Sequence, residues 1–247
     1  MSGPKDEKAF LTARIEDHLS ANWEPYFTGV LDRRTQSELE PLLNRSGEPW
    51  AFYGAVPDAE RRILAVYPDY LAGEDLEWPV GAVYIPVGFE AEHRKVLGTL
   101  MSLGIKRENA GDIQIGEDFV QIVMLDRMKD FVLTEFTKLQ GHSVKPRWLE
   151  RGEIRILQRE YQETSVTAAS DRVDAVCAAL FHLSRTAAQE AVRTGDVNLN
   201  WLPVQKSDAR IHAGDVLSVR KKGKAAIDAC SEKTKKGRLR IDARYYK

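Results

Sequence analysis

Four short segments between residues 171 and 220 hold the side chains best suited to binding chemistry in this chain. They are Asp171-Arg172-Val173-Asp174, Leu183-Ser184-Arg185, residues 195–200 and residues 214–220. An arginine guanidinium can donate two parallel hydrogen bonds to a phosphate, or stack on an exposed base. A serine that caps a helix can also meet a phosphate at the helix N-terminus. The order of these segments predicts a module that binds RNA.

Two helices must position these side chains. Apolar residues recur at helical spacing between residues 173 and 180 and predict a helix over 171–182 with one buried face. Ser184 is a suitable N-cap for a second helix, which Gly195 can end. Arg185, Gln189 and Arg193 are spaced four residues apart, so they lie along one exposed side of that helix. Strands expected at 197–200, 216–220, about 226–230 and 238–244 complete a helix-helix-sheet module.

The net charge of −1 conceals a division along the chain. Residues 1–165 hold 20 Lys and Arg against 28 Asp and Glu, whereas residues 166–247 hold 16 against 9. Residues 220–247 alone hold 11 basic and 3 acidic side chains. Clustered Lys and Arg bind a phosphate backbone by releasing its counterions, so the asymmetry indicates a polyanion as partner. A solvated basic tail is the alternative interpretation.

The candidate RNA-binding side chains combine the two helices with the basic end of the chain. They are Arg172, Ser184, Arg185, Thr186, Gln189, Arg193, Arg220, Lys221, Lys222, Lys224, Lys235, Lys236, Arg238 and Arg240. Two of them have an alternative role, because Arg172 can pair with Asp171 or Asp174 and Ser184 can act as a helix cap. The basic residues from Arg193 onwards are expected to contribute charge collectively.

The middle of the chain predicts a second module. Strands are expected at 80–87, 112–115 and 119–125, helices at 91–103 and 128–139, and further strands at 143–148 and 153–159. This β-α-β-β-α-β order is the split βαβ arrangement, which RNA-recognition folds share with many others. No aromatic RNP-type strand sequence is evident, so RNA contact by this region is left open. The basic pairs His93-Arg94 and Lys106-Arg107 can be helix-end charges or a second RNA contact.

The complete pattern predicts an α+β protein of three parts. Residues 1–75 form a helical and α/β region with helices at 6–19 and at 33–44, the latter interrupted at Pro41. Residues 76–161 form the RRM-like domain, and residues 166–247 form the helix-helix-sheet domain with its basic tail. The polar stretch from Gln162 to Ala169 is expected to be a linker.

Composition limits the remaining possibilities. No apolar run is long enough to span a membrane and the N-terminus lacks a signal-peptide pattern, so a cytoplasmic protein is expected. Cys177 and Cys230 are expected to be reduced packing residues, and the scattered histidines predict no metal site. No glycine-rich nucleotide loop and no pair of carboxylates in a catalytic context is present, so neither a cofactor nor a catalytic residue is predicted.

The segments at 171–220 resemble the S4 RNA-binding domain, whose pattern is Arg-Leu-Asp, then Ser-Arg, then Gly-x-Val-x-Val-Asn, then Gly-Asp-x-Ile. Trp201 stands where many S4 domains have Gly, and the pair Asn200-Trp201 is similar to the bacterial YlmH-like S4 proteins. Sequences such as Phe52-Tyr53-Gly54, Ala59-Glu60-Arg61-Arg62, Tyr67-Pro68-Asp69-Tyr70, residues 93–107 and Gly111-Asp112-Ile113 extend the resemblance over nearly the whole chain.

This resemblance implies a factor that binds structured RNA, both ribosomal RNA and tRNA, on the 50S subunit. We expect it to be a monomer and to insert into no membrane. The resemblance also implies a part in ribosome-associated quality control, where peptidyl-tRNA is stabilised while an untemplated tail is added. A related photosynthetic branch is associated with photosystem II. An assembly or interaction protein, linked to photosystem II or to cell division, is therefore the alternative.

An RNA-modifying enzyme is a further alternative, because S4 domains also accompany enzymes. Pseudouridine synthases that carry an S4 domain contain Gly-Arg-Leu-Asp, whereas this chain has Gly237-Arg238-Leu239-Arg240 and lacks the catalytic aspartate. The resemblance therefore predicts a protein that is not an enzyme.

Overall fold

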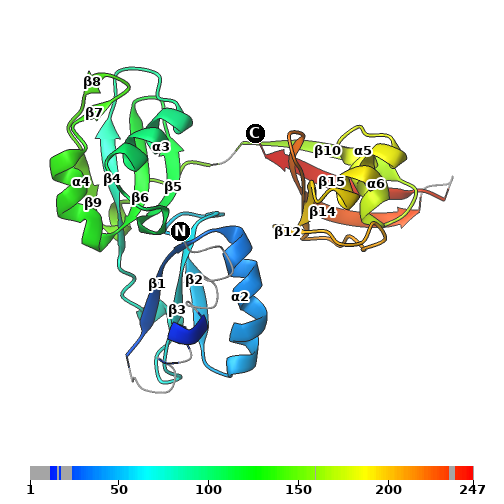
Figure 1. Ribbon diagram of the computed structural model, residues 1–247, viewed down its shortest axis with the longest axis horizontal. Helices are drawn as coiled ribbons and strands as arrows, with labels where there is room; N and C mark the ends of the chain where they lie inside the picture. Colours follow the sequence, from blue (N-terminus) through cyan, green and yellow to red (C-terminus); the bar gives the residue numbers. More distant parts are fainter. Residues whose placement is uncertain (1–11, 16, 18–23, 159, 234–236, 247) are drawn as a thin grey trace. The chain divides into compact units, whose positions relative to one another are not determined.

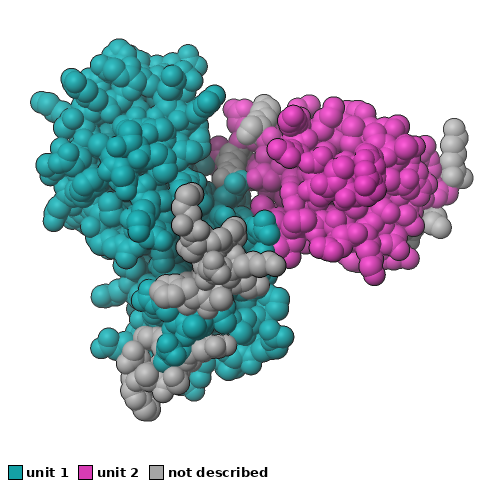
Figure 2. Space-filling model, in the orientation of Figure 1, with its two compact units in different colours: residues 1–157 teal, residues 158–247 magenta. Residues whose placement is uncertain are grey.

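The computed structural model describes residues 12–15, 17, 24–158, 160–233 and 237–246. The chain divides into two compact units, residues 1–157 and residues 158–247 (Figure 2). Each unit combines helices with antiparallel sheet, so the protein is a mixed α and β structure (Figure 1). The boundaries expected near residues 75 and 161–166 stay predictions. None of the helices in the described ranges is both long and apolar enough to cross a membrane.

The first part of unit 1 is a three-stranded antiparallel sheet with one helix against it. The elements are β1 (Tyr26–Leu31), α2 (Arg33–Ser46), β2 (Trp50–Tyr53) and β3 (Arg62–Val66), with strand order β1-β3-β2. The predicted interruption at Pro41 is wrong, because α2 continues through it. Leu39 and Leu43 on either side of the proline are buried against β3, and this packing holds the helix together. The helix expected at 6–19 falls mostly outside the described residues.

A four-stranded antiparallel sheet forms the second part of unit 1, in the order β5-β6-β4-β9. Its elements are β4 (Val80–Pro86), α3 (His93–Ser102), β5 (Ala110–Ile115), β6 (Phe119–Leu125), α4 (Lys129–Glu135) and β9 (Arg147–Leu149), with the short strands β7 (Lys138–Leu139) and β8 (His142–Ser143) as a separate hairpin. Val96 and Leu100 of α3 and Val132 of α4 pack with Val83 and Ile85 of β4, so both helices contribute to one core with this sheet. The β-α-β-β-α-β order expected from periodicity is therefore present.

The strand predicted at 153–159 is wrong for the described residues. Arg151–Glu153 form a short 3-10 helix, and residues 154–158 have no regular secondary structure. The side chain of Gln121 takes the place of a neighbouring strand here. It accepts a hydrogen bond from the Arg155 amide at 3.0 Å and donates one to the Arg155 carbonyl at 2.9 Å, so the main chain of Arg155 is satisfied without a sheet partner.

Arg61 and Asp112 fasten the two parts of unit 1 to each other. The Asp112 carboxylate accepts hydrogen bonds from the main-chain amides of Glu60 at 2.8 Å and Arg61 at 3.0 Å. The Arg61 guanidinium in turn donates to the carbonyl oxygens of Ala110 and Arg107, both at 2.9 Å. These bonds bring the two sequence motifs around residues 59–62 and 111–113 into direct contact.

Substitution of Asp112 by alanine should destabilise unit 1. Two main-chain donors lose their acceptor, so the free energy of unfolding is expected to fall by about 2 kcal/mol. Urea unfolding checks this, with Glu117→Ala, an exposed carboxylate between β5 and β6, as the matched control. Equal unfolding midpoints for the two variants would show that Asp112 does not fasten the two parts.

Unit 2 is a six-stranded antiparallel sheet in the order β10-β15-β14-β13-β11-β12. Its elements are β10 (Tyr161–Ala168), α5 (Val173–Leu180), α6 (Arg185–Arg193), β11 (Val197–Leu199), β12 (Leu202–Pro203), β13 (Val216–Val219), β14 (Gly223–Lys233) and β15 (Leu239–Tyr246). The expected linker at 162–169 is wrong, because residues 161–168 form β10. They pair in register with β15, from Tyr161 opposite Tyr246 to Ala168 opposite Leu239.

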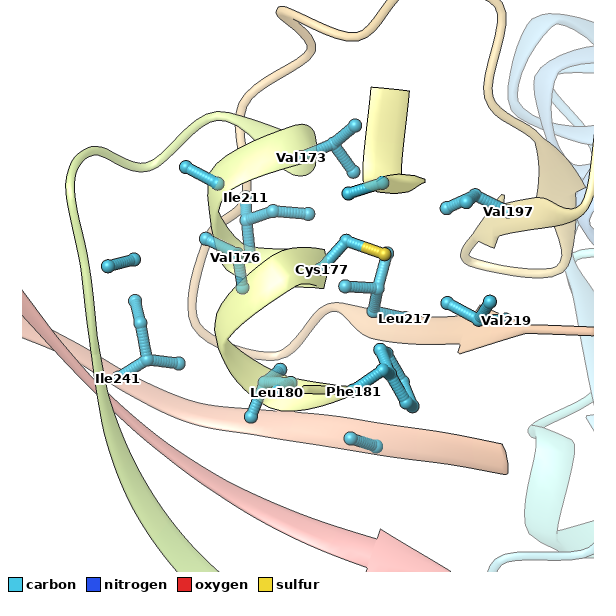
Figure 3. Packing of buried hydrophobic residues seen from close by; sticks show 14 of the residues in the cluster. Val173, Val176, Cys177, Leu180, Phe181, Val197, Ile211, Leu217, Val219 and Ile241 are labelled. Atoms are coloured by element: carbon cyan, nitrogen blue, oxygen red, sulfur yellow. The ribbon is translucent and has the colours of Figure 1, made fainter. Parts of the chain in front are cut away.

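One face of this sheet and helix α5 share a single apolar core. Val173, Val176, Cys177 and Leu180 of α5 are fully buried, as the periodicity predicted, and lie among Leu217, Val219 and Ile241 of the strands (Figure 3). Cys177 is a packing residue, and burial raises the pKa of its thiol to about 11. This core fixes the N-terminus of α5, where the candidate interface begins.

Candidate nucleic-acid interface

Asp174 is a buried carboxylate around which three candidate side chains gather. It lies in the first turn of α5 and its side chain is 0% exposed. Arg172 donates to both of its oxygens at 3.1 Å, and Gln189 of α6 donates to Oδ2 at 2.9 Å. Arg185 Nε lies 3.6 Å from the same oxygen. The candidates Arg172, Arg185 and Gln189 are thus brought together, and we call them the α6 surface.

The charges around Asp174 keep it ionised. Burial alone would raise the pKa of this carboxyl, but hydrogen bonds from Arg172 and Gln189 and the positive charges of Arg172 and Arg185 hold it below the ordinary value. The two arginines stay partly exposed, at 36% and 54% of their side-chain areas. The buried Asp174 carboxylate therefore holds both guanidinium groups in place, while part of each arginine side chain faces solvent.

The lowered pKa gives Asp174 a pH signature. The unfolded chain binds a proton at this carboxyl near the ordinary value of about pH 3.9, whereas the folded chain binds it only at lower pH. The stabilisation is therefore present above that value and is lost as the pH falls through the folded pKa. We expect urea titrations at decreasing pH to show a steeper loss of unfolding free energy in the native chain than in Asp174→Asn. Parallel pH profiles for the two proteins would contradict this.

Ser184 is the N-cap of α6. Its Oγ accepts a hydrogen bond from the Ala187 amide at 3.1 Å, which confirms the predicted capping role. Thr186 is exposed on the first turn of the same helix. The capped end places Arg185 beside Asp174.

Two basic residues near this surface were missed from the sequence. Arg210 lies opposite Arg172 in an isolated β-bridge, and its Nη1 is 2.6 Å from Asp171 Oδ2. Lys206 is exposed in the same loop, which reaches α5 through hydrogen bonds such as that from the Asp174 amide to the Ser207 carbonyl. The loop between β12 and β13, which carries both residues, has no repeating apolar pattern. Their basic side chains were therefore the only signal in the sequence that could have marked them as candidates.

The other end of α6 meets the turn between β13 and β14. Arg193 pairs with Glu190 in the last turn of the helix, with Nε 2.8 Å from Oε2. The Arg220 amide donates to the Asp196 carbonyl at 2.9 Å, and its Nη1 lies 3.6 Å from Asp196 Oδ1. Arg220, Lys221 and Lys222 are all exposed, and we call them the basic turn. The exposed row of side chains Arg185, Gln189 and Arg193 therefore leads along α6 toward the basic turn.

Other candidates lie elsewhere on unit 2. Ile241 and Ala243 of β15 face the core beneath α5. Arg240, the residue before Ile241, therefore projects from the opposite side of the sheet, where its Nε lies 3.0 Å from Asp242 Oδ1. Lys224 is also on that side, with Nζ 4.2 Å from the centroid of the Tyr246 ring. Arg238 donates to the Thr167 carbonyl at 2.9 Å. Lys235 and Lys236 lie outside the described residues. The structure therefore does not gather all candidates on one surface.

Asn200 and Trp201 form the tight turn between β11 and β12. Both have positive φ, of 49° and 65°. Asn200 donates to Asp215 at 2.8 Å and accepts from the Val216 amide at 2.9 Å, which fixes the turn to β13. A residue with a Cβ costs about 1–2 kcal/mol in the left-handed region, which explains why Gly is favoured at the second position and makes Trp201 a costly substitute.

No grouping suited to a metal ion occurs in the ranges that the structure describes. Three or more His, Cys, Asp or Glu side chains are nowhere close enough together there to hold one. The chemistry that the described geometry favours is hydrogen bonding and ion pairing with a polyanion.

Comparison with known proteins identifies the family. The chain is 30% identical over 242 residues to "Ribosome-associated protein quality control protein P2" of Bacillus subtilis (strain 168), covering 96% of this chain and 94% of that protein. It belongs to the YlmH family. Residues 73–151 match the family model described as "Putative RNA-binding domain in YlmH".

A solved structure of a YlmH-family protein has a related fold. It is "Cell division protein ylmH from Streptococcus pneumoniae", with a TM-score of 0.52 and 22% identity. The match covers 62% of this chain and 95% of that chain. The resemblance to YlmH-like proteins inferred from the sequence motifs is confirmed.

Proposed function

We propose that this YlmH-family chain is a non-enzymatic RNA-binding factor of ribosome-associated quality control. It contacts ribosomal RNA and tRNA on the large subunit, as a monomer. Unit 2 acts as the S4 domain and residues 76–161 act as an RRM-like domain. The name of the Bacillus subtilis relative and the RNA-binding family model support the biological setting.

The observation that carries the proposal is the α6 surface. Arg172 and Arg185 are held by one buried carboxylate, so part of their conformational entropy is already lost before any ligand binds. A guanidinium held in this way can form a bidentate pair with a phosphate at a smaller entropic cost than a free surface arginine. The basic turn adds positive charge beyond the far end of α6.

Co-sedimentation with 50S subunits tests the proposal. Arg185→Gln with Arg193→Gln removes two exposed charges and leaves Arg172 to neutralise Asp174, so the fold should be retained. We expect this variant to leave the 50S fraction at a salt concentration where the native chain stays bound. The matched control is Arg34→Gln with Arg127→Gln, two exposed charges of unit 1. Equal sedimentation of the two variants would refute RNA binding through α6.

The salt dependence gives an independent check. If about 5 phosphates are neutralised, the logarithm of affinity for a structured ribosomal RNA fragment should fall against the logarithm of salt concentration with a slope near −4. A slope near zero would exclude phosphate contacts as the source of binding. Partners that stay bound after nuclease treatment would favour a protein-binding role instead.

A further inference from the structure

The four-stranded sheet of unit 1, β5-β6-β4-β9, carries a stacked aromatic pair on the face away from α3 and α4. Val83 and Ile85 of β4 belong to the core shared with α3 and α4, so Tyr84 between them projects from the other face. Phe119 of the neighbouring strand β6 lies on that same face, and the two rings are nearly parallel, with centroids 5.1 Å apart and an interplanar angle of 16°. Paired rings on adjacent central strands are the arrangement by which sheet-based RNA modules stack bases.

Neither ring is accessible in the structure, because residues 154–157 cover them together with Arg147, which lies against Tyr84. Tyr84 and Phe119 are each only 5% exposed. The guanidinium carbon of Arg155 lies 4.8 Å from the Tyr84 centroid and 4.9 Å from the Phe119 centroid. Ile154 and Leu157 pack against the same cluster. A planar cation therefore occupies the position over the rings that a base would take.

The covering segment has few attachments of its own. Residues 154–158 belong to no helix or strand, and Ile156 is 60% exposed. The main chain of Arg155 makes its two hydrogen bonds to the Gln121 side chain. The segment also ends where unit 1 ends, at residue 157, so it can move without breaking a strand of either unit.

The covering segment lies outside the part of the chain that matches the family model. The RNA-binding family model spans residues 73–151, which includes both aromatic rings and Arg147. It stops before Arg155 and the rest of the covering segment. Arg147 would stay in place when the cover leaves, with its guanidinium carbon 4.3 Å from the Tyr84 centroid.

We infer that Tyr84 and Phe119 form a second RNA site, for the bases of a single strand, which residues 154–157 cover in the free protein. Arg155 competes with a base for the two rings. The site is distinct from the α6 surface, and the inference rests on the proposed function only for the choice of RNA as the polymer. Base stacking on aromatic rings is tolerant of sequence, so a short unstructured oligonucleotide is sufficient to detect it.

The test uses the full chain with Arg185→Gln and Arg193→Gln, which removes the two arginines of α6, so that RNA binding through that helix contributes little to the result. Binding of a fluorescently labelled oligouridine of about ten nucleotides is followed by anisotropy. Arg155→Ala removes the competing cation, and we expect affinity to rise about fivefold or more, since one stacked base contributes at least this much. Arg127→Ala is the control for the loss of one positive charge, and it should weaken binding slightly or leave it unchanged.

A second substitution locates the site. Adding Tyr84→Leu to Arg155→Ala should abolish the gain, because an aliphatic side chain keeps the core filled but cannot stack. Hydrogen exchange of the residue 155 amide reports whether the cover has opened. If this amide stays protected in Arg155→Ala, Gln121→Ala is used instead to open the covering segment, because it removes both hydrogen bonds to the main chain of Arg155. The inference would be overturned if the covering segment opens but the affinity for oligouridine does not rise. It would also be overturned if the rise in affinity persists when Tyr84→Leu is added.

Discussion

Asp174→Asn is expected to weaken RNA binding even though it removes a negative charge. Simple electrostatics predicts the opposite, since a more positive protein attracts a polyanion more strongly. The loss arises because Arg172 and Arg185 are held by the carboxylate, and an amide offers one acceptor where two are needed. A drop of about tenfold in affinity corresponds to about 1.4 kcal/mol. Anisotropy with a ribosomal RNA fragment measures it.

The same substitution should also lower the free energy of unfolding. The amide nitrogen faces the donors of Arg172 and Gln189 in a site that is closed to water, so a buried donor is left unpaired. A loss of about 2–4 kcal/mol is expected, the range between a lost hydrogen bond and a broken buried ion pair. Urea unfolding at neutral pH gives the value.

Asp171→Asn is the matched control for both measurements. It removes one negative charge from the same surface, but Asp171 pairs with an arginine that is 68% exposed, and such pairs contribute little. We expect its stability to be unchanged within about 0.5 kcal/mol and its RNA affinity to stay equal or rise. If Asp174→Asn binds RNA as tightly as Asp171→Asn, Asp174 does not position the arginines.

Local sequence signals predicted the helices of unit 2 and the order in which helices and strands follow one another in the second part of unit 1. The buried face of α5 repeats within a single helix, and Ser184 caps α6 through a bond that spans three residues. Such patterns are set by neighbours along the chain, so periodicity and capping rules were sufficient to find them.

The errors occur where the partner is distant in sequence. The polar composition of residues 161–168 indicated a linker, but β10 is held by β15, with Tyr161 opposite Tyr246. Residues 154–158 have strand-like composition but bind a side chain of β6, so they form no strand.

The candidate interface was predicted by residue type and not by its organisation. Helical spacing placed Arg185 and Gln189 on one face, and Asp174 was one of the two partners considered for Arg172. That all three side chains meet at Asp174 was not predicted, because this contact joins positions 15 residues apart and needs the packed helix pair. One sequence signal could have shown that some candidates, such as Arg240, lie on the other side of the sheet from the core beneath α5. Strand alternation around the apolar Ile241 and Ala243 already places Arg240 on the opposite side of the sheet.

Two sets of three charges should therefore differ in their effect on RNA binding. Replacing Arg220, Lys221 and Lys222 of the basic turn by Gln is expected to lower affinity by a factor on the order of 10², since each phosphate contact contributes about fivefold at physiological salt. The set Lys224, Arg240 and Arg244 has the same charge and should have an effect of less than about threefold, since it acts only by long-range attraction. Arg240 and Lys224 project from the sheet face away from α5, and Arg244 pairs with Asp228 at 2.9 Å.

The salt slope makes the comparison independent of absolute affinity. Loss of the basic turn should reduce the slope by about 3 in log-log units, whereas loss of the second set should leave it nearly unchanged. Thermal unfolding of both variants verifies that the fold is retained. Equal reductions would mean that RNA senses only the total charge of unit 2. A larger reduction from the second set would place the RNA on the face opposite α6 and would refute the interface proposed around Asp174.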